Sequence, residues 1–158
     1  MYILQKHYSN KKIIMKTTDQ PIIVEQLFNK SVIEVWRAVT EQDKMVQWFF
    51  KDIPEFKAEV GFKVQFNVKA PSRDFLHHWT ITEVIPQQKI VYNWKYKDFK
   101  GDSYVTFELF EIENQTKLVL TAKVLEDFDD SIIEFKRESG VAGWNYFIKD
   151  SLVTFLNN

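Results

Sequence analysis

The chain has 158 residues, of which 45% are hydrophobic, 16% aromatic and 27% charged, and its formal net charge is −1. This length suits one globular domain with a sizeable core, and the near-zero charge gives no support for binding nucleic acid or an anionic membrane. The chain contains no cysteine, which excludes a disulfide framework, a thiol nucleophile and thiolate metal sites. No apolar run approaches the roughly 18 residues of a membrane span, and we expect a cytoplasmic protein.

Residues 1–21 are the least regular part of the sequence, and we interpret them as an N-terminal extension ahead of a single domain at residues 22–158. Tyr2-Ile3-Leu4 is too short for the apolar core of a signal peptide. The run MKTTDQP, from Met15 to Pro21, has the character of a natural N-terminus, so Met15 is a candidate alternative start. Otherwise, the first residues are expected to be a tail or an added edge strand.

The domain is expected to begin with a strand and two short helices. Residues 22–28 are β-branched and apolar, which favours a strand. Ser31 and Glu34 have the spacing of a capping box and predict the start of a first helix. A second helix, residues 41–48, is expected to follow with Thr40 as its cap.

From Phe56 onward the apolar period changes from helical to two, which predicts consecutive strands. In residues 62–69, Phe and Val alternate with Lys, Gln and Asn, so one face should be buried and the other hydrated. Comparable segments follow at residues 75–85, 89–96, 105–109 and 116–123, with turns between them. Consecutive strands joined by short turns favour an antiparallel meander.

The C-terminal stretch, residues 131–158, predicts one long helix. At about 100° per residue, one arc collects Val141, Trp144, Asn145, Ile148, Leu152 and Phe155. Ser131 followed by Glu134 has the pattern of a second capping box, which would give a helix of about 25 residues. Gly140 and Gly143 are expected to let this helix approach the sheet closely. The predicted fold class is therefore α+β: a curved antiparallel sheet of about six to seven strands, with the long helix across its concave face.

Four stretches of sequence carry a resemblance to a known family. They are SVIEVWRAVT (31–40) with MVQWF (45–49), EVGFKV (59–64), TEVIP (82–86) leading to IVYNW (90–94), and GW (143–144) with the apolar residues after it. In order and spacing they resemble the SRPBCC (START and Bet v 1-like) superfamily, and within it the family named after the activator of Hsp90 ATPase homologue 1. The resemblance covers residues 22–156 and implies a helix-grip fold with a cavity between sheet and helix.

Two departures from the family pattern limit what the resemblance implies. Family members often carry a histidine shortly before the Gly-Trp pair, where this chain has residues 138–142, ESGVA. Many also carry a histidine near the end of the last strand, where this chain has Ala122. No role that depends on those histidines is carried over.

Residues that could support catalysis or bind metal are sparse in the sequence. His77 and His78 are adjacent, so only one of them can point into a cavity from a strand, and parity places His77 on the face of Trp79. No His/Asp/Glu cluster has metal-ligand spacing, and no phosphate-binding loop or nucleophile motif is present. We therefore expect no metal and no cofactor. Asn145 either pairs with a sheet hydroxyl such as Tyr92 or Tyr96, or bonds a ligand or cavity water.

The candidate ligand-binding residues combine aromatic side chains with few polar groups. They are Trp48, Phe66, His77, Trp79, Tyr92, Trp94, Trp144, Asn145 and Ile148. The aromatic residues either line a pocket or form a solid core, and the sequence leaves both open. We expect the protein to bind a hydrophobic or aromatic small molecule or a lipid, without catalysis.

Two alternatives to simple binding remain. One is an enzyme acting on an aromatic or polyketide-like substrate, with acid–base help from His77, Tyr92 or Glu83. The other is a stress-related or Hsp90-related interaction module, as the family name suggests, and a protein partner or a weak homodimer stays open with it. A shifted pKa in the cavity would favour the enzyme, whereas an exposed apolar patch over a filled interior would favour the interaction module.

Overall fold

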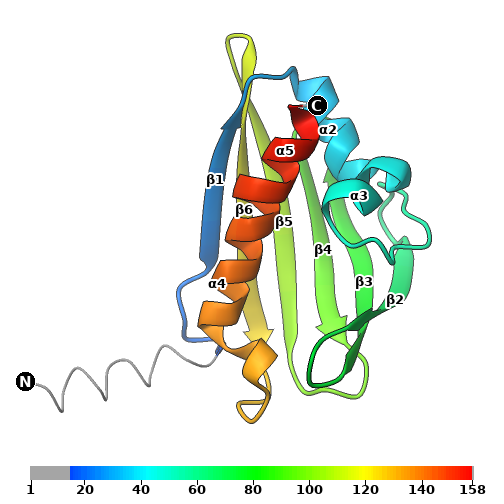
Figure 1. Ribbon diagram of the computed structural model, residues 1–158, viewed down its shortest axis with the longest axis vertical. Helices are drawn as coiled ribbons and strands as arrows, with labels where there is room; N and C mark the ends of the chain where they lie inside the picture. Colours follow the sequence, from blue (N-terminus) through cyan, green and yellow to red (C-terminus); the bar gives the residue numbers. More distant parts are fainter. Residues whose placement is uncertain (1–14, 158) are drawn as a thin grey trace, which may run out of the picture.

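The computed structural model describes residues 15–157, so the tail or edge strand considered for residues 1–14 lies outside the described part. Within that part, six strands form one antiparallel sheet in the order β1-β6-β5-β4-β3-β2 (Figure 1). The strands are β1 (Ile22–Phe28), β2 (Lys63–Lys69), β3 (Asp74–Ile85), β4 (Lys89–Tyr96), β5 (Asp102–Ile112) and β6 (Gln115–Glu126). The predicted meander is confirmed from β2 to β6, and β1 joins it beside β6.

Two short helices, α2 (Val32–Thr40) and α3 (Gln42–Trp48), connect β1 to β2. The capping box predicted for α2 is confirmed, because Glu34 N donates to Ser31 Oγ and Ser31 N donates to Glu34 Oε2 at 3.1 Å. The cap predicted for α3 is wrong. Thr40 Oγ1 donates instead to the carbonyl of Trp36 at 2.6 Å, a back-bond that keeps Thr40 in α2, and Glu41 takes the N-cap position of α3.

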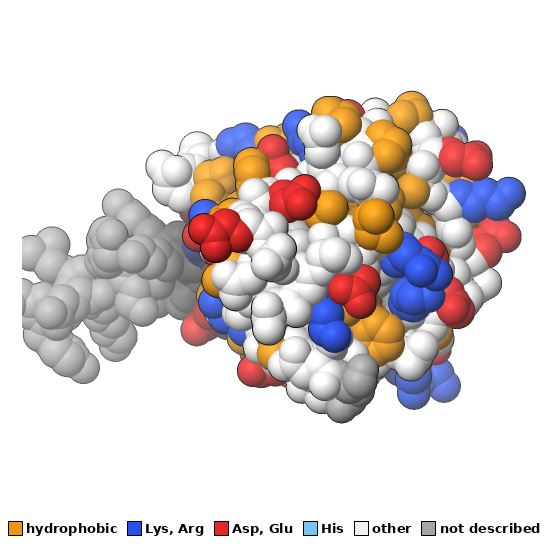
Figure 2. All heavy atoms as spheres, turned by 90° about the horizontal axis from the view of Figure 1, so that it is seen from above, with side chains coloured by type: hydrophobic (Ala, Val, Ile, Leu, Met, Phe, Trp, Pro, Cys, Tyr) orange, Lys and Arg blue, Asp and Glu red, His pale blue; other side chains and the backbone are white. Residues whose placement is uncertain are grey.

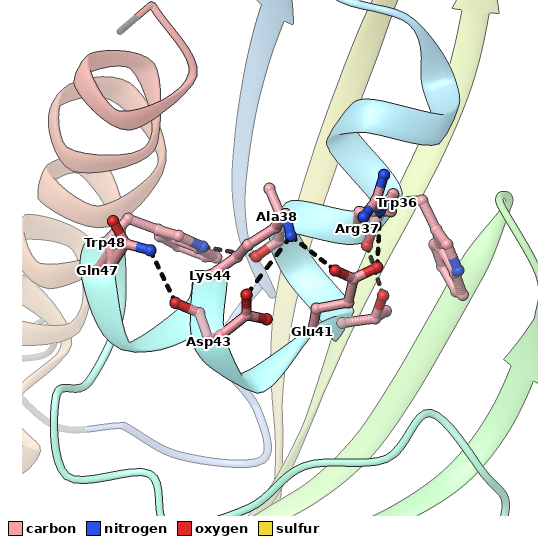
Figure 3. Close-up of polar contacts among 9 residues, drawn as sticks. Trp36, Arg37, Ala38, Glu41, Asp43, Lys44, Gln47 and Trp48 are labelled. Atoms are coloured by element: carbon pink, nitrogen blue, oxygen red, sulfur yellow. Dashed lines mark hydrogen bonds and ion pairs between the residues drawn. The ribbon is translucent and has the colours of Figure 1, made fainter.

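The α2–α3 corner is fixed by one polar cluster and one buried indole (Figure 3). Glu41 accepts from Arg37 Nε at 2.8 Å and from Lys44 Nζ at 2.7 Å. Because these side chains are substantially exposed, each ion pair contributes little to stability. The stronger constraint is Trp48, which is 2% exposed and donates its Nε1–H to the carbonyl of Ala38 at 2.7 Å. This bond locks α3 against α2 while the indole ring fills the core.

The long C-terminal helix is present, but its predicted start is wrong. It consists of α4 (Arg137–Asn145), a π-helical segment η2 (Tyr146–Ser151) and α5 (Leu152–Leu156), after a short 3₁₀ turn η1 (Ile133–Phe135). Ser131 bonds Asp129 Oδ1 through both its N and its Oγ, at 2.9 and 2.7 Å. Glu134 accepts a hydrogen bond from Ser72, which is remote in sequence. Both residues of the expected capping box are therefore engaged elsewhere.

The helices cover the concave face of the curved sheet in two sections (Figure 1). The helices α2, α3 and α5 lie over one end of the sheet, and α4 lies over the other end. The largest fully buried side chains include Trp48, Trp79, Tyr92 and Phe107, which form part of one continuous core. This layered arrangement of a sheet and a long helix is the predicted helix-grip fold.

The surface is mixed in character, in keeping with the net charge of −1. Figure 2 shows acidic, basic and hydrophobic side chains interspersed over the end of the molecule nearest the C-terminus. Within residues 15–157, no helix is both long and apolar enough to cross a membrane.

Candidate ligand-binding cavity

A cavity of about 240 Å³ lies between the sheet and α4, and it is partly open to solvent. The sheet supplies lining residues from β1, β3, β4, β5 and β6, and the irregular segment 15–20 borders the cavity as well. Most of the lining surface is apolar, and ten of the 22 lining residues have apolar side chains: Met15, Ile22, Phe50, Trp94, Val105, Ala122, Val124, Phe128, Trp144 and Phe147. The hollow part of the concave face is therefore the part that α4 covers.

Small residues on α4 explain why space remains there. A Cβ atom added at Gly143 would meet no atom within 4 Å, so this glycine borders open space. The prediction that Gly143 allows close approach to the sheet is therefore wrong. For Gly140 the same prediction is confirmed, because an added Cβ would lie 3.2 Å from Ile22 Cδ1 and 3.4 Å from Met15 Sδ. The helix is held close to the sheet at Gly140 and leaves a gap one turn later.

A second apolar cluster borders the cavity, and Phe128 belongs to both. Its buried members are Phe75, Phe128, Ile132 and Phe135. Phe128 packs directly on Gly101, whose φ of +123° is accessible mainly to glycine. A Cβ at Gly101 would lie only 2.3 Å from Phe128 Cδ1. The turn before β5 thus requires glycine both for its backbone and for the aromatic ring that covers it.

Residues 15–20 are held beside the cavity by three long-range hydrogen bonds. These bonds join Phe128 N to Met15 O (3.3 Å), Thr17 N to Asp127 Oδ1 (2.7 Å) and Arg137 Nη1 to Gln20 O (2.7 Å). The sequence pattern places residues 1–21 in an extension ahead of the domain, and the structure adds that residues 15–20 border the cavity. Because the segment has no periodicity, the sequence pattern carries no signal of these contacts.

His77 is the most buried polar group in the cavity wall, with 4% of its surface exposed. The predicted parity is confirmed, since the burial of β3 alternates and His77 lies on the buried face with Trp79. The Nδ1 atom lies 3.1 Å from the carbonyl oxygen of Phe75. A carbonyl only accepts, so Nδ1 carries the proton and Nε2 is left with its lone pair. Burial lowers the pKa of His77 to about 4, although the bond to Phe75 acts in the opposite direction.

Tyr96 is the cross-strand partner of His77 and also lines the cavity. Its hydroxyl oxygen accepts a hydrogen bond from Trp94 Nε1 at 3.0 Å. Burial raises the pKa of Tyr96 to about 12, and the bond from Trp94 opposes that shift. Both His77 and Tyr96 are therefore uncharged at neutral pH.

The charged residues around the cavity carry both signs and are half-buried or exposed. They are Lys16, Asp19, Lys123, Glu134 and Arg137. Because the signs nearly balance, the outer part of the cavity favours neither an anion nor a cation. One oxygen of Glu134 accepts from Ser72, and the other is enclosed without a partner among the described residues. Within the described chain no group of three potential metal ligands is present.

The structure distributes the sequence-predicted residues between the cavity and the core. His77, Trp94 and Trp144 line the cavity. Five other predicted residues are buried in the core and do not line the cavity: Trp48, Phe66, Trp79, Tyr92 and Ile148. Phe147 and Phe50 were missed. Phe147 follows Trp144 at helical spacing, which is a usable signal, whereas Phe50 follows α3 in an irregular segment.

Asn145 lies outside the cavity wall and is half-buried. The expected pairing with Tyr92 is wrong, since the buried Tyr92 hydroxyl has no partner in the described structure. Among the described residues no bond joins Asn145 to Tyr96, whose oxygen accepts from Trp94. The buried stripe of the helix follows Trp144, Ile148 and Leu152, which leaves Asn145 at its margin.

Known structures with the same fold cover nearly all of the described chain. Protein CV1439 from Chromobacterium violaceum is 18% identical, with a TM-score of 0.71 over 87% of this chain and 97% of its own. The AHSA1 (SPO3351) protein from Silicibacter pomeroyi is 17% identical, with a TM-score of 0.69 over 87% of this chain and 98% of its own. DynU16, a protein in the dynemicin biosynthetic locus, is 19% identical with a TM-score of 0.71, and this chain covers 48% of it.

At these identities the structural likenesses show the fold alone, and the family rests on sequence. No curated protein has a matching sequence. The model of one family, described as Activator of Hsp90 ATPase homolog 1-like protein, matches residues 29–157. This range runs from the end of β1 through the C-terminal helix and includes every motif quoted above. The chain therefore belongs to the Activator of Hsp90 ATPase homolog 1-like family.

Proposed function

We propose that the chain binds a compact apolar molecule, of about one or two rings, in the cavity between the sheet and α4. The observation that carries this proposal is the apolar space of about 240 Å³ beside Gly143. An apolar protein cavity of about 150 Å³ is known to hold benzene, and pockets for drug-sized ligands begin at about 300 Å³. The volume therefore suits a small ring system better than a lipid with long chains.

The composition of the wall also supports this function. Most of the lining surface is apolar, and two of its polar groups, His77 and Tyr96, are uncharged at neutral pH, while the charged residues of the wall are half-buried or exposed. Such a wall binds by burying apolar surface and uses a few polar contacts for orientation. Zero cysteine is compatible with a reducing compartment, and a cytoplasmic location stays a prediction.

Native mass spectrometry of protein purified without denaturation tests the proposal. We expect an extra mass on the wild-type chain that is released on unfolding. Gly143→Leu should abolish it, because a side chain at this position fills the cavity. The matched control is Ala142→Leu, which adds the same side chain at an exposed neighbouring position of α4 and should retain the bound mass. Equal retention by both variants would contradict the proposed location.

If the wild-type protein carries no extra mass, a thermal-shift screen with one-ring and two-ring compounds is the next test. Compounds that fit should raise the midpoint of unfolding, because a ligand that binds only the folded state stabilises it by mass action. The rise should be absent in Gly143→Leu and present in Ala142→Leu. A screen in which no compound stabilises the wild-type protein would overturn the proposed function.

Catalysis in the same cavity is a second candidate, and His77 is the observation that favours it. This histidine faces the cavity and has a shifted pKa, as catalytic residues often do. The direction of the shift weakens the case, because a base with a pKa of about 4 is a poor match to neutral pH. An enzyme would convert an added compound into one of different mass, and the conversion would depend on His77. Binding without conversion distinguishes the first function from the second.

A further inference from the structure

Two uncharged polar groups stand next to each other in the wall of the cavity. His77 on β3 and Tyr96 on β4 are directly opposite in the strand register. Their ring centroids are 4.7 Å apart and their planes meet at 82°. Both residues line the cavity, and they come from central rather than edge strands of the sheet. Their relative position is therefore set by the sheet itself.

Each of these two groups has one hydrogen-bonding position in use and one free. The Nδ1–H of His77 is used by the Phe75 carbonyl, which leaves Nε2 as an acceptor. The oxygen of Tyr96 accepts from Trp94 Nε1, which leaves the hydroxyl proton as a donor. Neither free position has a partner among the described residues. The pair thus presents one acceptor and one donor.

Aromatic side chains pack around His77, whereas the charged residues of the cavity wall are half-buried or exposed. The rings around His77 belong to Phe50, after α3, to Phe66 on β2, and to Trp94 and Tyr96 on β4, at centroid distances of 4.7–5.5 Å. Tyr96 is the only titratable residue among them. Buried polar groups in apolar surroundings gain most from a neutral partner that satisfies them, and a charged partner would need a counter-ion.

We infer that the cavity selects an apolar alcohol or phenol, whose hydroxyl group donates to His77 Nε2 and accepts from the hydroxyl of Tyr96. This inference rests on the proposed binding function. A hydroxyl fits because a single oxygen both donates and accepts. An ether or a carboxylate only accepts, so it would leave Nε2 unsatisfied. A carboxylate at the pair would in addition lose hydration, and neither His77 nor Tyr96 would supply a cation to compensate.

Four probes of one ring system test this selectivity: 2-naphthol, naphthalene, 2-methoxynaphthalene and 2-naphthoate. Their affinities for the full chain are measured by calorimetric titration at neutral pH. We expect 2-naphthol to bind at least about tenfold more tightly than naphthalene, since two satisfied hydrogen bonds outweigh the desolvation of the hydroxyl. The methoxy compound and the naphthoate should both bind more weakly than 2-naphthol. If His77 and Tyr96 did not bind the hydroxyl group, the cost of its desolvation would make 2-naphthol bind more weakly than naphthalene.

Variants of the pair identify the groups that recognise the hydroxyl. In Tyr96→Phe and in His77→Phe the affinity ratio of 2-naphthol to naphthalene should fall toward one. Naphthalene binding by the same variants shows that the cavity is still folded. The matched control is Tyr92→Phe, because the Tyr92 hydroxyl is also buried without a partner but lies outside the cavity wall. This variant should keep the wild-type ratio.

The outcomes separate this inference from the proposed function. Binding of naphthalene as tightly as 2-naphthol overturns the hydroxyl selectivity and leaves the binding function standing. A preference for 2-naphthol that survives Tyr96→Phe and His77→Phe overturns the assignment to this pair. Binding of none of the four compounds overturns the proposed function and the inference together.

Discussion

The protonation state of His77 follows from its position on β3, where successive side chains alternate between the buried and the outer face of the sheet. As the concave-facing member of the His77–His78 pair, it enters a set of aromatic rings and loses contact with water. Burial disfavours the charged imidazolium, so the pKa falls to about 4. Parity in the sequence predicts that His77 shares a face with Trp79, and the structure shows that this face is the buried one. The sequence does not predict the ring of Phe50, which approaches from an irregular segment and completes the apolar surroundings.

The lowered pKa of His77 makes stability depend on pH. In the unfolded chain the imidazole takes up a proton below about pH 6.5, whereas in the folded chain it stays neutral down to about pH 4. Between these values the unfolded state binds more protons, so stability is complete above about pH 6.5 and is lost as the pH falls toward 4. The loss should reach about 3 kcal/mol at the lower end.

Urea denaturation of wild type and His77→Phe across this range measures the effect. Carboxylates titrate in both proteins, so the difference between the two curves isolates His77. We expect the free energy of unfolding of the wild type to fall more steeply than that of the variant between pH 6.5 and about 4. Parallel curves would contradict the burial of a neutral imidazole.

At the scale of elements, two similar sequence patterns have different outcomes. Ser31-x-x-Glu34 forms the capping box that its spacing predicts. Ser131-x-x-Glu134 does not, because Asp129 and Ser72 offer these side chains other partners. Local spacing thus predicts a cap only where no neighbour competes for it. The strands were predicted more accurately, since the period of two persists wherever one face is buried.

The two glycines of α4 provide a prediction about this element. Gly143→Ala should raise the free energy of unfolding by about 1 kcal/mol, the usual gain of alanine over glycine inside a helix, because its Cβ meets no atom within 4 Å. Gly140→Ala should gain less or nothing, since its Cβ meets Ile22 at 3.2 Å. Chemical denaturation of both variants checks the difference.

A control from another element completes this test. Gly101→Ala should lower stability markedly, because φ is +123° and the ring of Phe128 occupies the space of the new methyl group. If Gly143→Ala instead destabilised the protein, the open space assigned to this turn of α4 would be wrong.

For the whole molecule, the concave face divides into a solid end and a hollow end. The fold implies a cavity between sheet and helix, and this much is predictable from the sequence motifs. The sequence does not predict which aromatic side chains fill the solid end, because Trp48, Trp79 and Trp144 all carry the same apolar signal. The division depends on small local features, such as the missing side chain of Gly143 and the segment 15–20, which only the folded arrangement brings together.

Truncating one tryptophan in each end should reveal this division as a difference in stability. Trp48 is 2% exposed, stacks on Phe49 at 4.8 Å and donates a hydrogen bond to Ala38. Trp48→Ala should therefore cost about 5 kcal/mol, at the upper end for such truncations, because it leaves a cavity and an unpaired carbonyl. Trp144 packs against Trp94 at 5.4 Å but also borders the existing cavity.

Trp144→Ala should cost less, about 3 kcal/mol, because part of its surface already faces empty space rather than packed atoms. Urea denaturation of both variants, under conditions where each unfolds in a single transition, gives the two free energies. Equal losses would mean that the end beneath α4 is as tightly packed as the end beneath α2 and α3. A clearly smaller loss for Trp144→Ala would show that the interior is densely packed where α3 lies and hollow where α4 lies, as a ligand site requires.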